Sequence, residues 1–242
     1  MTIKTSEGMI RVHKDVFCLT SPVIAKAMEG QFVESQEDCF DLSHEDPEII
    51  SRFVEFCYLS RYETVERVQQ IGFDLSLTKD DDGIVQYIGP TAVQRPNLPI
   101  LSRSSERGAS SRLPPRPSPT ARGPDAQESA KKTALILNAA RLRLDVSMWA
   151  MGDLYDVQHL KSYAVGQLNT RLSALWEQGN SPSLILDIVQ PVYECTFSIN
   201  DDLRIMLVQS LRKFKRAIGR EPLLRSRFEA LTKSNNELMT DL

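Results

Sequence analysis

A stretch rich in proline, arginine and serine divides the chain into two parts that can each contribute to a core. Eight of the 13 prolines lie between Pro90 and Pro124, together with six arginines, and the second half of this stretch offers only Leu113 as a large apolar side chain. Such a segment buries too little apolar surface to offset the entropy lost on ordering it. We therefore expect a disordered linker over residues 89–130. A flexible coil of that length spans on the order of 35 Å, so the two flanking blocks can still pack on each other.

Charge and hydropathy exclude several classes of protein. The 242 residues carry a formal net charge of −3, and 25% of them are charged and 41% hydrophobic. This balance is that of an ordinary globular protein and gives no reason to expect binding to nucleic acid or to a membrane. No apolar run is long enough to span a bilayer, and the first residues lack the apolar core of a signal peptide. We expect a cytoplasmic or nuclear protein.

Residue types that carry catalytic or metal chemistry are scattered. Four cysteines stand at wide, uneven gaps without a Cys-x-x-Cys pair, which argues against a disulfide framework or a zinc site. His13 has no second ligand at metal-binding spacing, so a structural histidine with a hydrogen-bonded ring is expected. The chain has neither a phosphate-binding Gly-Lys-Ser/Thr run nor a Gly-x-Ser-x-Gly elbow. We expect no metal, no cofactor, no small-molecule substrate and no enzymatic activity.

The first block, residues 1–62, is predicted to combine short strands with helices. Apolar residues alternate on both sides of the turn signal Ser6-Glu7-Gly8, which predicts two strands. Ser21-Pro22 and Asp46-Pro47 each place a capping side chain before proline, a pair that begins a helix. Behind the second pair, apolar residues recur at steps of three and four and predict one buried helix face. Residues 63–88 fit no clear pattern.

The second block, residues 131–220, is predicted to be all helical. The expected helices are Ala134–Leu144, Met148–Tyr155, Val157–Leu168, one opened by Asn180-Ser181-Pro182 and one opened by Asn200-Asp201-Asp202. Asp156 is expected to be a cap between the second and third of them. Residues 221–242 are expected to form a tail with a further weak helix. A 62-residue α+β unit alone is marginally stable, so helices of the second block can cover its open side.

Five short motifs follow one another along the chain in a characteristic order. They are Val12-His13-Lys14, Ser21-Pro22, Gln31-Phe32-x-Glu34-Ser35, Asp46-Pro47 with Tyr58, and the segment Met148–Ala164. This order resembles the BTB/POZ domain, a protein-interaction fold. The resemblance implies an α+β fold with a small sheet flanked by helices, followed by an all-helical C-terminal extension. The helices from Pro182 to Phe214 resemble the C-terminal part of fungal BTB proteins, and Gly152 stands where the family usually has alanine.

The chain departs from this family in two places. It begins at the first strand, without the N-terminal helix through which many BTB domains dimerise, and this leaves the oligomeric state open. Residues 63–130 replace what is normally a short connection, either as a natural insertion or as an artefact of the gene model.

The resemblance implies an adaptor or scaffold that acts by surface complementarity. Cullin-binding BTB proteins carry a hydrophobic-x-Glu motif in the loop that is Phe32-Val33-Glu34 here. Phe32 would anchor in a partner pocket and Glu34 would fix the register by its charge. Alternatively, Phe32 packs on its own domain and Glu34 is a solvated loop charge. The implied function is a substrate adaptor for a cullin ubiquitin ligase; self-association or binding of a transcriptional partner is the alternative.

Overall fold

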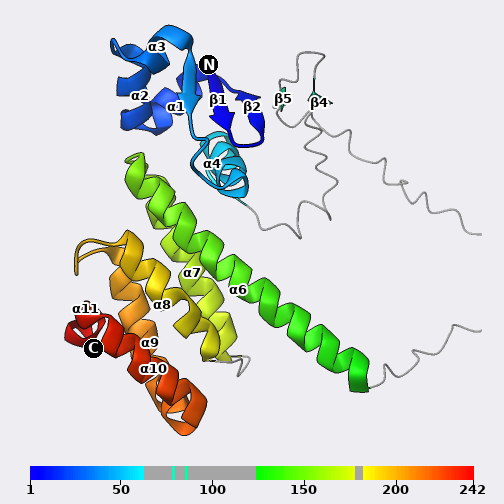
Figure 1. The fold of residues 1–242 in the computed structure, drawn as a ribbon, viewed down its shortest axis with the longest axis vertical. Coiled ribbons are helices and arrows are strands. Elements are labelled where there is room, and N and C mark those ends of the chain that lie inside the picture. The colour runs from blue at the N-terminus through cyan, green and yellow to red at the C-terminus, as the bar shows by residue number, and fades with distance from the viewer. Residues whose placement is uncertain (63–77, 80–84, 87–123, 178–181) are drawn as a thin grey trace, which may run out of the picture.

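A computed structural model describes the N-terminal block, two short strands and most of the C-terminal block. The described residues are 1–62, 78–79, 85–86, 124–177 and 182–242. A small sheet with four helices forms one end of the molecule, and a bundle of longer helices extends away from it (Figure 1). The expected α+β fold with a helical C-terminal extension is confirmed.

The sheet is built around the first two strands. Strand β1 (Thr2–Thr5) pairs antiparallel with β2 (Gly8–Arg11) and parallel with β3 (Cys39–Asp41). Strand β2 also pairs with β5 (Val85–Gln86), which in turn pairs with β4 (Thr78–Lys79), so the order is β3-β1-β2-β5-β4. The last two strands come from the range 63–88, to which the sequence assigned no structure.

Four helices cover this sheet. They are α1 (Lys14–Thr20), α2 (Pro22–Glu29), α3 (Val33–Glu37) and α4 (Pro47–Leu59). Both predicted cap-and-proline starts are confirmed. Ser21 Oγ accepts from the Ile24 amide at 3.1 Å at the start of α2, and Asp46 Oδ1 accepts from the Glu48 amide at 2.8 Å at the start of α4. Each side chain thus satisfies one of the amides that a helix start leaves unpaired.

The helical block begins with one long helix. Helix α6 (Pro124–Leu154) runs without interruption, so the prediction of separate helices Ala134–Leu144 and Met148–Tyr155 was wrong. The two predicted segments are continuous through Asp145, whose carboxylate is buried and bonded to other elements. Helix α6 also includes residues 124–130, which the sequence placed in the linker; residues 89–123 of that linker lie outside the described residues.

A tight corner joins α6 to α7 (Gln158–Glu177). Asp156 adopts φ of 54°, its amide donates to the Asp153 carbonyl at 3.2 Å, and the Val157 amide donates to the Gly152 carbonyl at 2.7 Å. This pattern is the left-handed ending of a helix, so Asp156 terminates α6 and is a cap between the two helical segments, as predicted. A Cβ on Gly152 would lie 3.1 Å from the Lys161 amide nitrogen, so an alanine here would require its neighbours to shift.

The remaining helices complete the bundle. They are α8 (Ser183–Cys195), α9 (Asp202–Arg220), α10 (Pro222–Ser234) and α11 (Asn236–Asp241). Helix α8 has Pro182 at its cap position, while Asn180 and Ser181 lie outside the described residues. Asp201 precedes α9 as predicted, but its carboxylate accepts from the amides of Phe197 and Ser198 and so closes the preceding loop.

The last 22 residues, expected as a tail, form α10 and α11 and pack on the bundle. Leu224 and Leu238 are buried in the common core. Arg204 on α9, only 4% exposed, forms ion pairs with Asp241 at 2.6 Å and with Glu237 at 2.7 Å. These contacts fasten the end of the chain to α9.

The two blocks share one hydrophobic core. Tyr155, at the end of α6, packs its ring against Phe53 and Phe40, with ring centroids 5.7 and 5.8 Å apart. Ser21, fully buried, donates from its hydroxyl to the Tyr155 carbonyl at 2.6 Å while it caps α2. Helix α4 lies against α6 at this joint (Figure 1). The expectation that helical segments cover the N-terminal unit is confirmed.

Candidate protein-interaction site

Phe32 and Val33 form an apolar projection between α2 and α3. Phe32 has an extended backbone at the cap position of α3, and its side chain is 59% exposed; Val33 is 62% exposed. Two large apolar side chains are thus exposed at adjacent positions of one loop. The expected anchor residue therefore lies on the surface.

Gly30 determines where the Phe32 ring lies. A Cβ at Gly30 would stand 2.6 Å from Cδ2 and 2.7 Å from Cε2 of Phe32, distances too short for any side chain. One face of the ring thus rests on the glycine backbone, and the rest is open. The ring thus packs on its own domain while the residue is 59% exposed, and its role as an anchor in a partner pocket stays a prediction.

Backbone contacts hold this segment at both ends. The Gly30 amide donates to the Lys26 carbonyl at 3.1 Å, which ends α2. Asp38, with φ of 50°, ends α3, and its carbonyl accepts from the Thr2 amide at 2.8 Å. The loop between α2 and β3 is therefore tied to the sheet, and a partner would meet a surface that is largely formed beforehand.

Glu34 lies in the first turn of α3, two residues after Phe32. Its side chain is half-buried, and within the described parts of the chain the structure records no hydrogen bond or ion pair for its carboxylate. A carboxylate beside an exposed aromatic ring can accept hydrogen bonds from amide or cationic donors of a partner.

His13 contacts Tyr58, which joins the first and fourth of the resembling motifs. The His13 amide donates to the Tyr58 hydroxyl oxygen at 2.9 Å, and His13 Nδ1 lies 2.8 Å from the same oxygen. The ring is thus held by a hydrogen bond at the end of α4. Among the described residues, no group of three or more His, Cys, Asp and Glu side chains could hold a metal ion.

A buried ionic cluster at the joint of the two blocks was missed by sequence reasoning. The fully buried Asp145 accepts from the Tyr62 hydroxyl at 3.0 Å and from Arg171 Nε at 2.8 Å. Burial raises the pKa of Asp145 to about 6, and the opposing effects of Arg171 and Tyr62 keep it from rising further. The sequence signal for this cluster was an acid between two apolar residues, Leu144 and Val146, because a charge at a buried position needs buried partners.

A comparison with family models matches residues 1–72 to the BTB/POZ domain. Neither the curated proteins nor the solved structures contain a match to this chain. No helix in the described portion is long and apolar enough to cross a membrane. The likeness of the C-terminal helices to fungal proteins stays a prediction. The chain carries a BTB/POZ domain at residues 1–72, the general role of this domain is protein–protein interaction, and the elements described from residue 124 onward are all helices.

Proposed function

We propose that this chain is an adaptor whose BTB/POZ domain binds a cullin scaffold through Phe32 and Glu34. The exposed Phe32 ring, fixed over Gly30, is the observation that carries this proposal. Covering its open area in a partner pocket would contribute about 2–3 kcal/mol, the size of an interface hot spot. Glu34 would set the orientation, and another surface of the chain would recruit a second protein.

A binding assay between purified cullin and the full chain tests the site. The double variant Phe32→Ala/Glu34→Ala should lose most of the binding, because it removes both the anchor and the orienting charge. Leu19→Ala is the matched control, since Leu19 is 88% exposed on the same domain but lies at the end of α1. Equal binding by the wild type and the double variant would show that Phe32 and Glu34 do not form the cullin-binding site.

Self-association of the BTB/POZ domain, or binding of a transcriptional partner, is the second candidate. Leu19 and Val23, 88% and 39% exposed, add apolar surface where α1 meets α2, apart from the Phe32 loop. Sedimentation analysis separates the candidates. A stable dimer without cullin binding favours self-association, and a monomer that binds cullin favours the adaptor.

A further inference from the structure

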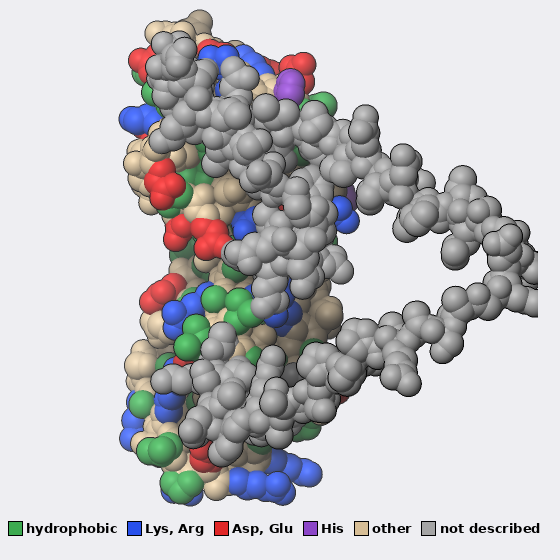
Figure 2. Space-filling view, turned by 90° about the vertical axis from the view of Figure 1, so that its right-hand side faces the viewer, with side chains coloured by type: hydrophobic (Ala, Val, Ile, Leu, Met, Phe, Trp, Pro, Cys, Tyr) green, Lys and Arg blue, Asp and Glu red, His purple; other side chains and the backbone are tan. Residues whose placement is uncertain are grey.

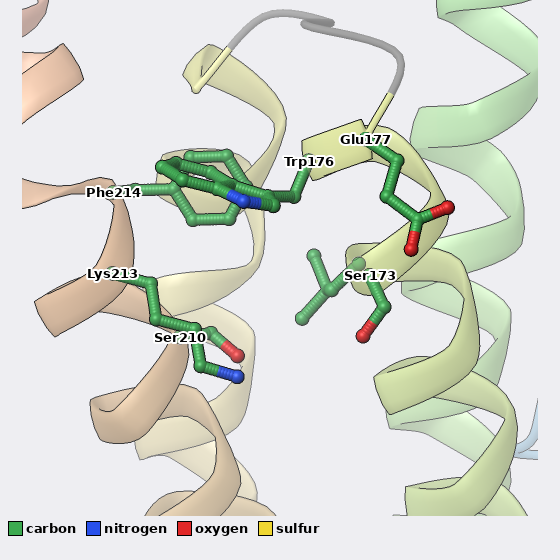
Figure 3. Close-up of a pocket in the computed structure, with 7 residues that line it drawn as sticks. Ser173, Trp176, Glu177, Ser210, Lys213 and Phe214 are labelled. Atoms are coloured by element: carbon green, nitrogen blue, oxygen red, sulfur yellow. The ribbon is translucent and has the colours of Figure 1, made fainter.

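A cavity of about 160 Å³ opens between α7 and α9, toward the end of the bundle that is remote from the sheet. Ser173, Trp176 and Glu177 reach into it from α7, and Lys213 and Phe214 flank it from α9 (Figure 3). The remaining lining residues are Leu172 and Ser210. The cavity thus has an aromatic wall, small hydroxyls at its base and charged side chains at its rim. We call it the Trp176 groove.

Trp176 is fixed in place yet half open. Its ring meets the ring of Phe214 edge to face, with centroids 4.9 Å apart and planes at 82°. Phe214 is 5% exposed and belongs to the core, whereas Trp176 is 49% exposed. A tryptophan held by the core but open on one side offers a large contact area at low entropic cost, as interface anchors do.

A basic stripe lies beside this groove on the second half of α9. Residues 212–220 contain five cations and no acid, and all five are exposed. Lys213, Arg216 and Arg220 follow a spacing of three and four residues, so they share one face over about 10 Å of helix. The structure records no ion pair for these three side chains within its described residues. Figure 2 shows Lys and Arg side chains at the lower end of the molecule, where Figure 1 places the junction of α9 and α10.

We infer that the Trp176 groove and this basic stripe dock an acidic peptide segment that carries one apolar side chain. The apolar side chain would lie against Trp176, and about three extended residues would match the length of the stripe, with carboxylates at alternate positions facing it. Charge complementarity favours this occupant. A single aromatic platform, Trp176, does not suit the successive stacked bases of a nucleic acid.

The biological role of this site rests on the proposed adaptor function, because an adaptor needs a second docking surface. Its test is independent of cullin. The probe is a short fluorescent peptide in which one leucine is followed by glutamates, and the control peptide has glutamines in their place. Binding to the full chain is followed by anisotropy and by the emission of Trp176. The other tryptophan, Trp149, is buried and should not respond.

Two variants in the groove and one control decide the assignment. Trp176→Ala and Lys213→Glu should each weaken binding of the glutamate peptide by about tenfold. Lys215→Glu makes the same charge change on the same helix, but it lies about 160° around the helix from Lys213 and should change the affinity by less than about twofold. Lys213 and Lys215 are both exposed, so these two variants should keep the fold, which circular dichroism checks.

Three results would overturn the inference. They are equal binding of the glutamate and glutamine peptides, an equal loss in Lys213→Glu and Lys215→Glu, and tighter binding of a single-stranded oligonucleotide than of the peptide. Phe32→Ala/Glu34→Ala should bind the peptide like the wild type. A chain that binds the peptide but not cullin therefore refutes only the proposed cullin function, and the reverse result refutes only the Trp176 groove.

Discussion

Replacement of Tyr62 by phenylalanine tests whether the buried carboxylate of Asp145 fastens the two blocks together. The variant keeps the aromatic ring, which packs on Tyr163 with centroids 5.1 Å apart, and removes only the hydroxyl that donates to Asp145. Arg171 would remain as the other partner. A hydrogen bond to a buried charged group contributes about 1.5–3 kcal/mol. We expect the free energy of unfolding to fall by about 2 kcal/mol where Asp145 is ionised.

The pH dependence distinguishes this mechanism from a simple loss of packing. Burial raises the folded-state pKa of Asp145 from 3.8 to about 6. A raised acid pKa stabilises the fold fully below about pH 4, and this contribution, about 3 kcal/mol, is lost as the pH rises through about 6. The Tyr62 hydroxyl stabilises the ionised form, so its removal should raise the pKa of Asp145 by about 0.7 units if the bond to the ionised carboxylate is stronger by about 1 kcal/mol.

Urea denaturation followed by circular dichroism, near pH 8 and near pH 4, measures both effects. The control is Tyr58→Phe, which removes a hydroxyl bonded to the exposed His13, where water can replace it. That variant should cost about 0.5–1 kcal/mol near pH 8. If Tyr62→Phe costs no more than Tyr58→Phe, or costs the same at both pH values, the ionised carboxylate of Asp145 does not fasten the blocks.

Thermal unfolding of further variants tests three other contacts. Gly152→Ala should lower the free energy of unfolding by about 1–3 kcal/mol because its methyl group meets backbone atoms of the α6–α7 corner, whereas Gly166→Ala, with open space around it, should raise it by about 0.5–1 kcal/mol. A change of the same sign in both variants would contradict this expectation. Arg204→Ala leaves the carboxylate of Asp241 buried without its cation, so we expect a loss of about 3–5 kcal/mol and faster proteolysis of α11; unchanged cleavage would show that α11 is held by other contacts. Ser21→Ala removes a helix cap and a bond to a buried carbonyl and should cost about 2–4 kcal/mol; a cost below about 1 kcal/mol would mean that the hydroxyl is replaceable.

Local signals predicted the elements that depend on local physics. Ser21-Pro22 and Asp46-Pro47 begin helices because a cap and a fixed proline φ act within a few residues. The same local signals did not show that Ala134–Leu144 and Met148–Leu154 belong to one helix, because the partners that hold the Asp145 carboxylate are distant in the sequence.

The site residues show the same limit. The motif pointed to Phe32 and Glu34, but the exposure of Phe32 depends on how its ring meets Gly30, which no spacing rule reports. The Trp176 groove was invisible in the sequence because α7 and α9 become neighbours only in the folded chain. The sequence signal that points to this surface is the excess of cations over acids in residues 212–220.

The bond from Ser21 to the Tyr155 carbonyl has a consequence for biosynthesis. Its two ends are 134 residues apart, so the N-terminal block cannot complete its core until α6 has left the ribosome. At about 5–20 residues per second, translation of that interval takes on the order of ten seconds. During this time the rings of Phe40 and Phe53 lack the packing contact with Tyr155. A nascent chain with uncovered aromatic side chains is a substrate for chaperones, and translation speed through the intervening residues should affect the yield of folded protein.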